Sequence, residues 1–507
     1  MQNELKTYHI LTFGCQMNLS DSERFSQYLN NLGLKETDTW KNADLVILNT
    51  CSVRQKAEDR IIGVVKNIRE NSPIQPTIVL TGCMARRVWD ESKNVANSVQ
   101  KDKLTRENEL KNLIPGLDIV VETKDFTTLG ERLGFKTKFD DKPEHYLSFK
   151  PKYKSSFQAY VPISTGCNHF CTFCIVPYSR GKEVCRDASE IIREVFDLVK
   201  HGYKDITLLG QTVNRWINPQ MKDMFEYNEA LTKISGLNET PLHQKDLEKW
   251  RDFFKAKLNS SEYDFDNELK MPKDFLQLLQ VIDQIPGEWW TTWISSHPNY
   301  MTKELISFVG QSSKNNALEN KGNGHQRPYL HFALQSGSDK VLKRMNRRHT
   351  MKEFKEIVKL MKKEIPNLAL STDIIIGFIG ETEEDFQLTL KAQKELEFDM
   401  IYIAEYSPRS GTAAARLPDK ISPQIKAQRK EELNEILKKV AYKKNKKLID
   451  KTLKVLIEGK DRKGYLSGRT PNNKIVRIKS DQSLIGKFVD VKITSATPWA
   501  LEGIVIS

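Results

Sequence analysis

Three cysteines stand close together in the middle of the chain. Cys167, Cys171 and Cys174 lie in the stretch GCNHFCTFC with C-x(3)-C-x(2)-C spacing. Three thiolates this close can bind three corners of a cubic iron–sulfur cluster and leave the fourth iron open to a small ligand. Structural zinc needs four ligands, and no second cysteine pair follows nearby. His169, inside the loop, is a fourth ligand only with strained geometry. The spacing therefore favours a cluster over zinc.

A second set of three cysteines is spread over the N-terminal part of the chain. Cys15, Cys51 and Cys83 each follow a short apolar run that is typical of a strand. The runs are Thr7–Thr12, Asp44–Leu48 and Thr77–Thr81, with Leu117–Val121 as a fourth, and predicted helices at about Asp21–Asn31 and Gln55–Glu70 alternate with them. A capping box of Ser20 and Glu23 predicts the start of the first helix.

This alternation predicts a parallel, Rossmann-like α/β domain over residues 1–145. Ligands gather at the carboxyl ends of parallel strands, so the three thiols should converge at one edge of the sheet. We therefore expect a second three-cysteine cluster. The alternative is three buried small side chains, because free cysteine is often internal.

The middle of the chain repeats the same pattern six times. Strand-like runs alternate with helical segments over residues 152–440, and the first run precedes the cysteine loop. The runs are Gln158–Ser164, Asp205–Gly210, Thr291–Ser296, Tyr329–Gln335, Leu368–Ile376 and Met400–Tyr406. Six such units predict a partial (βα)6 barrel of the TIM type, with its chemistry at the carboxyl ends of the strands.

Two segments interrupt or follow this barrel. Residues 216–271 are long, charged and poor in strand signal, with a helix predicted at His243–Lys257, and we interpret them as a surface insertion rather than a substrate lid. Ile421–Leu453 is a lysine-rich helix whose lysines we expect to face solvent. Its apolar stripe is Ile425, Leu433, Ile436, Leu437 and Val440.

The C-terminal residues 441–507 change to five short strand-like runs separated by turn residues. This pattern predicts a small antiparallel β barrel of the oligonucleotide-binding type. The segment is basic, and small barrels with basic loops commonly bind a nucleic-acid backbone. The candidate RNA-binding residues are Arg462, Lys463, Arg469 and Lys474.

Composition limits the class of protein. The chain has 507 residues, 39% hydrophobic and 29% charged, so we expect several domains with their own cores. No apolar run reaches the length of a membrane span, and the N-terminus lacks the layout of a signal peptide. We expect a cytoplasmic protein whose seven cysteines are ligands or reduced thiols. The net charge of +13 suits a polyanionic partner.

Taken together, these motifs resemble the methylthiotransferase branch of the radical S-adenosylmethionine (SAM) enzymes. The resemblance is carried by GCQMN, NTCSVRQKA and GCMARR in the N-terminal part, and by STGCNHFCTFCIVPYSRGKE, ISSHP, LQSGSDKVLKRMNR, STDIIIGFIGET and YSPRSGT in the barrel. The tail motif GRTPNN is similar to the TRAM domain, a small RNA-binding barrel. Within the branch, GCQMN and CSVR resemble the MiaB subfamily, which methylthiolates isopentenylated adenosine next to the anticodon of tRNA. Ile379, where proline is common, and the seventh cysteine, Cys185, depart from the pattern; we interpret Cys185 as a spare thiol.

The resemblance implies two [4Fe-4S] clusters and SAM. Cys167, Cys171 and Cys174 would hold the cluster that binds SAM, whose reductive cleavage gives the radical that attacks carbon 2 of the adenine. Cys15, Cys51 and Cys83 would hold the auxiliary cluster that carries sulfur. Phe173 is expected near the adenine of SAM, and further SAM contacts are sought at strand ends in Gln211, Ser295, Gln335, Ser371 and Asp373. We expect a monomer that uses an electron donor such as flavodoxin or ferredoxin.

Other interpretations remain open at this point. A methylthiotransferase that acts on threonylcarbamoyl-adenosine or on a ribosomal-protein aspartate differs little in its motifs. A non-catalytic iron–sulfur protein that binds RNA or transfers electrons predicts no cleavage of SAM. A zinc-bound RNA-binding module predicts zinc instead of iron.

Overall fold

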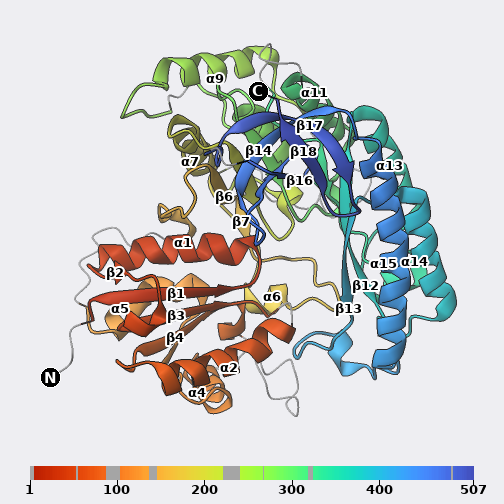
Figure 1. The fold of residues 1–507 in the computed structure, drawn as a ribbon. Helices are drawn as coiled ribbons and strands as arrows, with labels where there is room; N and C mark the ends of the chain where they lie inside the picture. The colour runs from red at the N-terminus through yellow and green to blue at the C-terminus, as the bar shows by residue number, and fades with distance from the viewer. Residues whose placement is uncertain are drawn as a thin grey trace.

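The computed structural model describes residues 5–52, 55–86, 103–135, 146–220, 240–265, 268–317, 324–480 and 483–506. Three parts follow one another along the chain: an N-terminal sheet domain, a larger open barrel and a small β barrel near the C-terminus (Figure 1). None of the helices in the described part is long and apolar enough to cross a membrane.

The N-terminal domain has a five-stranded parallel sheet, as predicted. Its order is β2-β1-β3-β4-β5. The strands are β1 (Thr7–Phe13), β2 (Lys35–Glu36), β3 (Leu45–Thr50), β4 (Thr77–Gly82) and β5 (Ile119–Val120), and the helices are α1 (Gln16–Asn31), α2 (Gln55–Asn71), α4 (Lys103–Leu113) and α5 (Leu129–Arg132). All six residues of β3 are buried, because separate apolar clusters cover the two faces of the sheet.

Two boundaries of this domain differ from the sequence predictions. Helix α1 begins at Gln16, with Cys15 as its N-cap, so Ser20 and Glu23 lie inside the helix instead of starting it. Tyr146 and Leu147 are buried in the core that lies between α1 and the sheet, so that core continues beyond residue 145.

The central part is an open, six-stranded parallel barrel, which confirms the predicted architecture. Its strands are β6 (Gln158–Pro162), β9 (Asp205–Leu209), β10 (Trp290–Trp293), β11 (Tyr329–His331), β12 (Ala369–Ile376) and β13 (Met400–Glu405). They pair as β6-β9-β10 and β11-β12-β13, and bridges from Thr291 to Gln326 and from Ser296 to Phe332 join the two groups. Helices α7 (Ala188–Lys200), α10 (Phe275–Ile282), α11 (Lys303–Ala317), α13 (Met351–Glu364) and α14 (Glu383–Leu396) lie outside (Figure 1).

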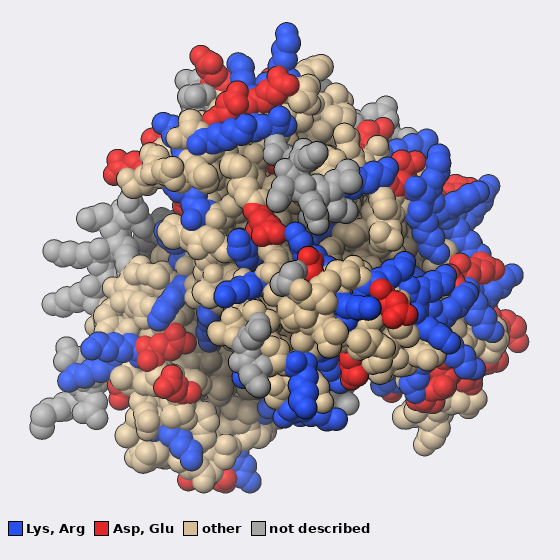
Figure 2. Space-filling model, turned by 45° about the horizontal axis from the view of Figure 1, so that its top comes forward, with Lys and Arg blue, Asp and Glu red and all other residues tan. Residues whose placement is uncertain are grey.

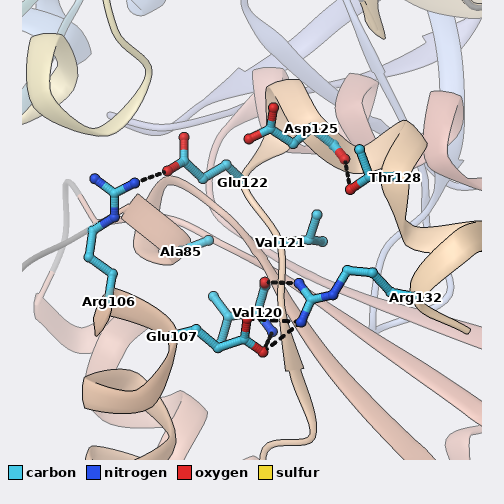
Figure 3. Close-up of a pocket in the computed structure, with 9 residues that line it drawn as sticks. All are labelled: Ala85, Arg106, Glu107, Val120, Val121, Glu122, Asp125, Thr128 and Arg132. Atoms are coloured by element: carbon cyan, nitrogen blue, oxygen red, sulfur yellow. Dashed lines mark hydrogen bonds and ion pairs between the residues drawn. The ribbon is translucent and has the colours of Figure 1, made fainter. Parts of the chain in front are cut away.

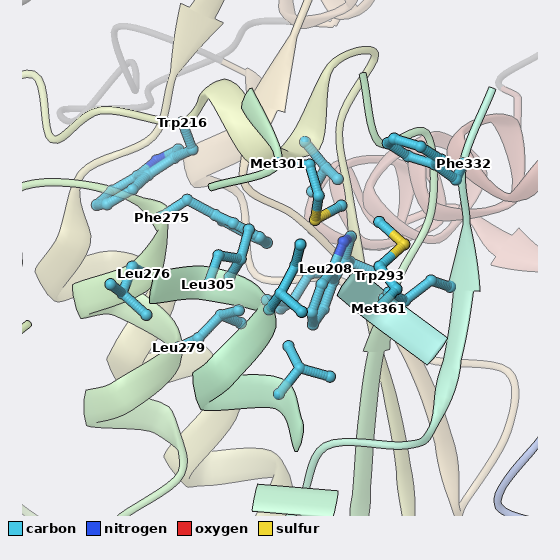
Figure 4. Close-up of a cluster of buried hydrophobic side chains, with 14 of the residues drawn as sticks. Leu208, Trp216, Phe275, Leu276, Leu279, Trp293, Met301, Leu305, Phe332 and Met361 are labelled. Carbon is cyan, nitrogen blue, oxygen red and sulfur yellow. The ribbon is translucent and has the colours of Figure 1, made fainter. Parts of the chain in front are cut away.

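The largest core lies between these strands and their helices. Every residue of α10 is buried, and Phe275 meets Trp293 of β10 edge to face with ring centroids 5.3 Å apart. Figure 4 shows Leu276, Leu279 and Leu305 in the same cluster. Aromatic and branched side chains from both layers interlock here, which fixes the strands that carry the cysteine loop.

The segment interpreted as a surface insertion is partly core. Its helix α9 (Gln244–Lys257) packs Trp250 and Phe254, both fully buried, against the barrel cluster. The rings of Phe254 and Phe196 of α7 lie 4.9 Å apart. The prediction of a surface elaboration is therefore wrong for residues 240–265, whereas residues 221–239 lie outside the described residues.

Helix α15 (Pro423–Lys446) runs beside β13 and α14. Its central apolar residues Leu433 and Leu437 are buried as predicted, but Ile425 is 43% exposed. The first turns bury Lys426 and Arg429 instead, because these cations pair with carboxylates of the barrel loops: Arg429 donates to Glu381 at 2.7 Å.

The C-terminal barrel is closed, with strands in the order β14-β15-β16-β18-β17. They are β14 (Thr452–Lys460), β15 (Leu466–Arg469), β16 (Ile475–Ile478), β17 (Phe488–Ala496) and β18 (Leu501–Val505). The prediction of a purely antiparallel barrel is wrong for one pair, since β16 and β18 are parallel. A parallel pair of the third and fifth strands is what closes a five-stranded barrel of this Greek-key type.

This small barrel docks on the amino ends of the central strands, opposite the cysteine loop. Arg327, just before β11, donates to the carbonyls of Thr470 and Pro471 at 2.8 and 3.0 Å. Trp290, the first residue of β10, contacts Phe488 with ring centroids 4.5 Å apart. Part of the GRTPNN motif is thus a docking surface inside the protein.

We expect Arg327→Ala to loosen this contact. The guanidinium is 3% exposed, and its loss leaves buried carbonyls without donors, so the free energy of the first unfolding transition in urea should fall by about 2–4 kcal/mol. Arg462→Ala, on an exposed turn of the same barrel, is the control and should change it by less than about 0.5 kcal/mol. Equal effects of the two substitutions would contradict this account of the docking.

Candidate functional site

The sheet register brings the three N-terminal cysteines to one edge. Phe13 of β1 pairs with Thr50 of β3, and Thr50 pairs with Gly82 of β4. Cys15, Cys51 and Cys83 follow these residues by two, one and one positions, at the carboxyl ends of three neighbouring parallel strands. The predicted convergence is confirmed.

Two asparagines hold this edge together. The Asn18 side chain donates to Asn49 Oδ1 at 3.0 Å, while Asn49 donates to the Asn18 carbonyl at 2.8 Å. Asn18 Oδ1 also accepts from the Cys15 backbone N–H at 3.3 Å. At Gly14 an added Cβ would lie 2.2 Å from Asn18 Oδ1, so only glycine fits. The sequence motifs GCQMN and NTC contain these residues, but their letters alone did not reveal the contact.

Cys83 has the environment of a thiolate. A hydrogen bond with the Cys51 thiol lowers the pKa of Cys83 to about 5 against the opposing effect of burial, and the Arg180 guanidinium lowers it further. Arg180 Nε lies 3.2 Å from Cys83 Sγ, and its Nη2 lies 2.8 Å from Asp21 Oδ2. Arg180 comes from the barrel domain, directly after helix α6 (Val176–Ser179), so both domains build this site.

The second cysteine set lies on a loop at the carboxyl end of β6. The Cys167 N–H donates to the Gly181 carbonyl at 3.1 Å, and Thr172 binds the end of helix α12 (Asp339–Arg344) through the Arg344 carbonyl at 2.8 Å. Gly166 has a φ of +78°, and an added Cβ would clash with the Lys182 carbonyl. Burial raises the pKa of Cys167 and of Cys174.

His169 has no ligand-like position in the loop. Its ring stacks on His297 with centroids 4.2 Å apart, and burial lowers its pKa to about 3. Within the described residues, no three Cys, His, Asp or Glu side chains are grouped as one metal ion would require. A cluster separates its ligands more widely, because each thiolate binds a different iron. Two sets of three thiols without a fourth ligand therefore fit two clusters, each with one open iron.

Three of the candidate SAM residues lie near the loop. Phe173 packs edge to face on Phe378, with ring centroids 6.3 Å apart. Gln335 and Ser295 follow strands β11 and β10 and have left-handed backbones, with φ of +74° and +71°. Gln335 Oε1 is buried and has no hydrogen-bond partner among the described residues. Such strained residues at strand ends are typical of functional sites.

The other candidates differ in depth. Gln211 is half-buried, two residues beyond β9. On β12, Asp373 pairs with His331 at 3.3 Å, and Ser371 is fully buried with its hydroxyl 2.7 Å from that of Tyr329. At about 3.3 Å per residue, Ser371 lies some 13 Å before Ile375, which shares an apolar cluster with Phe173. We therefore leave Ser371 out of the proposed SAM contacts.

The four candidate RNA-binding residues divide into two pairs. Arg462 and Lys463 are exposed on the turn between β14 and β15. Arg469 pairs with Glu458 at 3.2 Å, and Lys474 pairs with Asp399 of the central barrel at 2.6 Å. Arg462 and Lys463 are therefore placed to meet a partner, whereas the other two cations already have acid partners within the protein.

Two further features lie outside the cysteine sets. A small pocket of about 160 Å³ lies beside Ala85, lined by Arg106, Glu107, Glu122 and Arg132 (Figure 3). These charges pair with one another, Arg106 with Glu122 at 2.7 Å, and the volume is too small for SAM. Cys185 pairs with Ser164 in a short two-stranded sheet and packs against the barrel core, where burial raises its pKa to about 11.

Sequence reasoning missed the arginines of the site. Arg180 and Arg347 each contact a cysteine sulfur, and Arg409 forms an ion pair with Glu58 at 3.7 Å. All three lie inside motifs that were recognised, SRGKE, MNR and YSPRSGT, but a charged residue in a motif does not reveal which sulfur it meets.

Family comparisons agree with these three parts. Residues 7–102 match the uncharacterised protein family UPF0004, residues 161–253 and 312–392 match the Radical SAM superfamily, and residues 446–506 match the TRAM domain.

Full-length relatives are also similar. The chain is 35% identical to a tRNA-2-methylthio-N(6)-dimethylallyladenosine synthase of Clostridium tetani, over 99% of this chain and 97% of the relative. Enzymes of the same name from Thermodesulfovibrio yellowstonii and Dictyoglomus thermophilum are 34% and 35% identical, with 98–99% of both chains covered. The chain therefore belongs to the tRNA-2-methylthio-N(6)-dimethylallyladenosine synthase family, the MiaB branch of the radical SAM methylthiotransferases.

Proposed function

We propose that this enzyme methylthiolates carbon 2 of isopentenylated adenosine next to the anticodon in tRNA. The observation that carries the proposal is the pair of three-cysteine sets on two domains that meet at Arg180. Cys167, Cys171 and Cys174 hold the [4Fe-4S] cluster that binds SAM, and Cys15, Cys51 and Cys83 hold the auxiliary cluster. Together with SAM, the bound clusters supply the radical, the sulfur and the methyl group.

The protein's own groups position these reactants and keep water away. Phe173 and Phe378 form an apolar wall beside the cysteine loop, and Gln335 Oε1 is a buried acceptor for an N–H or O–H group of SAM. Asn18 and Asn49 fix the strand ends that carry the auxiliary thiols. Placement of this kind matters because a carbon radical reacts with whatever lies nearest.

The RNA reaches this site from a distance, since the TRAM barrel lies at the far ends of the barrel strands. Strand β12 alone spans about 26 Å at 3.3 Å per residue. Arg462 and Lys463 on the TRAM turn therefore contact phosphates remote from the adenosine that reacts. Lys and Arg also gather over the side of the molecule that carries α13, α14 and α15, at the right of Figure 2.

An external one-electron donor of the flavodoxin or ferredoxin type completes the reaction, because SAM cleavage consumes an electron. We propose that the enzyme acts as a monomer in the cytoplasm.

A turnover assay tests the proposed substrate. Anaerobically reconstituted protein with SAM and a reductant should convert an anticodon stem-loop with isopentenyladenosine to the methylthio product, seen by mass spectrometry. Unmodified and threonylcarbamoyl-adenosine stem-loops, and the ribosomal-protein peptide with its aspartate, are the controls. Methylthiolation of a control in place of the isopentenylated RNA, or SAM cleavage without product, would refute the proposal.

Iron content tests the six ligands. We expect about eight irons per chain, falling to about four in Cys51→Ser because three thiolates are needed to retain a cluster. Cys185→Ser is the matched control and should keep eight irons, since its thiol packs against the barrel core. Loss of iron in Cys185→Ser, or full iron in Cys51→Ser, would show that the ligand set is assigned wrongly.

Charge reversal tests the TRAM contact. The double variant Arg462→Glu and Lys463→Glu should bind the tRNA about tenfold more weakly, because each lost phosphate contact removes counterion release. Its slope of log affinity against log salt should fall by about 0.7 per contact. Lys249→Glu with Lys255→Glu on α9 gives the same change in charge elsewhere. If both double variants weaken binding equally, net charge and not the TRAM turn controls affinity.

A further inference from the structure

Each cysteine set has an arginine that contacts one of its sulfurs. Arg180 Nε lies 3.2 Å from Cys83 Sγ, and Arg347 Nη1 lies 3.8 Å from Cys171 Sγ. Each arginine also has a buried nitrogen, Nη1 in Arg180 and Nε in Arg347, without a hydrogen-bond partner among the described residues. Two buried guanidinium groups that both contact a cysteine sulfur and both lack one acceptor need a common explanation.

The connection of Arg180 is crossed between domains. It follows α6, only six residues after Cys174 in the chain, yet its side chain reaches the other set. Figure 1 places α6 beside the edge of the N-terminal sheet. Asp21 of α1, fully buried, anchors Nη2 at 2.8 Å and so fixes the direction of the guanidinium plane. The auxiliary site is therefore completed by a residue that the barrel domain provides.

An unpaired N–H inside a protein is costly, because it has given up its hydrogen bonds to water. The sulfide corners of an iron–sulfur cluster are anionic acceptors, and a cluster held by Cys83 would bring one next to Arg180. The orphaned nitrogen is thus explained if the group it bonds is a cluster. Arg347 has the same relation to the cluster at Cys171.

We propose that Arg180 is a positioning residue for the auxiliary cluster, which donates one hydrogen bond to Cys83 Sγ and one to a cluster sulfide from across the domain interface. This inference rests on the proposed assignment of Cys15, Cys51 and Cys83 as ligands. Hydrogen bonds to sulfur and a nearby positive charge raise the reduction potential of a cluster. Arg180 therefore raises the potential of the auxiliary cluster and slows its loss of iron.

A merely structural role of Arg180 is the competing explanation. The ion pair with Asp21 joins the two domains, and its loss alone could disturb the site. Asp21→Asn separates the two roles, because it removes the ion pair and leaves both N–H···S contacts in reach. Arg180→Lys keeps the charge with fewer donors, and Arg180→Gln removes the charge.

The experiment uses the full-length chain with one cluster at a time. One background carries Cys167, Cys171 and Cys174 as alanine and retains the auxiliary cluster; the other carries Cys15, Cys51 and Cys83 as alanine. Each receives Arg180→Gln or Arg347→Gln. The readouts are the midpoint potential from an EPR-monitored titration and the rate of iron loss to a chelator.

A double dissociation is expected. Arg180→Gln should lower the potential and speed iron loss roughly tenfold in the auxiliary-cluster background alone, and Arg347→Gln should do so in the other background alone. Arg180→Lys should fall between, and Asp21→Asn should leave the potential close to that of its background.

Three results would overturn the proposal. An unchanged potential in Arg180→Gln removes the hydrogen bond to sulfur, and an equal change in Asp21→Asn shows that the ion pair alone matters. A first background that binds no iron refutes the assignment of the N-terminal ligands, and with it the role of Arg180. In that case the second background still reports on the SAM cluster, so the two failures can be told apart.

Discussion

The contact of Arg180 with Cys83 and Asp21 is the interaction on which the two-domain site depends. It is the point where the loop of one cysteine set meets the thiols of the other, and all three groups are buried. A charged triad can remain buried only if its members stay together, because separating them leaves an unpaired charge inside the protein. The sheet domain and the barrel are therefore held in the one orientation that lets the two sets share a reaction space.

The rest of the fold supports this orientation. The aligned ends of β1, β3 and β4 gather three thiols that are far apart in the sequence. The apolar core below α10 and α11 makes the barrel rigid, and the TRAM barrel covers the amino ends of its strands through Arg327 and Trp290. Chemistry and RNA binding are consequently placed at opposite ends of the barrel strands, so a large substrate is needed to span both.

The sequence predicted the elements well where the pattern was local. Strand runs with flanking turn residues located the sheet, the six barrel strands and the five strands of the small barrel, and cysteine spacing located the site. It failed where distant partners decide the outcome. Lys426, Arg429 and Lys474 look like surface cations, but carboxylates brought in from elsewhere in the fold bury them. Trp250 and Phe254 lie in a polar segment and still complete the barrel core. The start of α1 was misplaced because a cysteine is an unusual N-cap.

The central claim is that two four-iron clusters face one another across the domain interface. Anomalous scattering at the iron edge from crystals of anaerobically reconstituted protein tests it most directly. Two separate iron sites are predicted, one bounded by Cys15, Cys51 and Cys83 with Arg180 beside it, and one bounded by Cys167, Cys171 and Cys174. A single iron site, or anomalous signal from zinc at either position, would contradict the account.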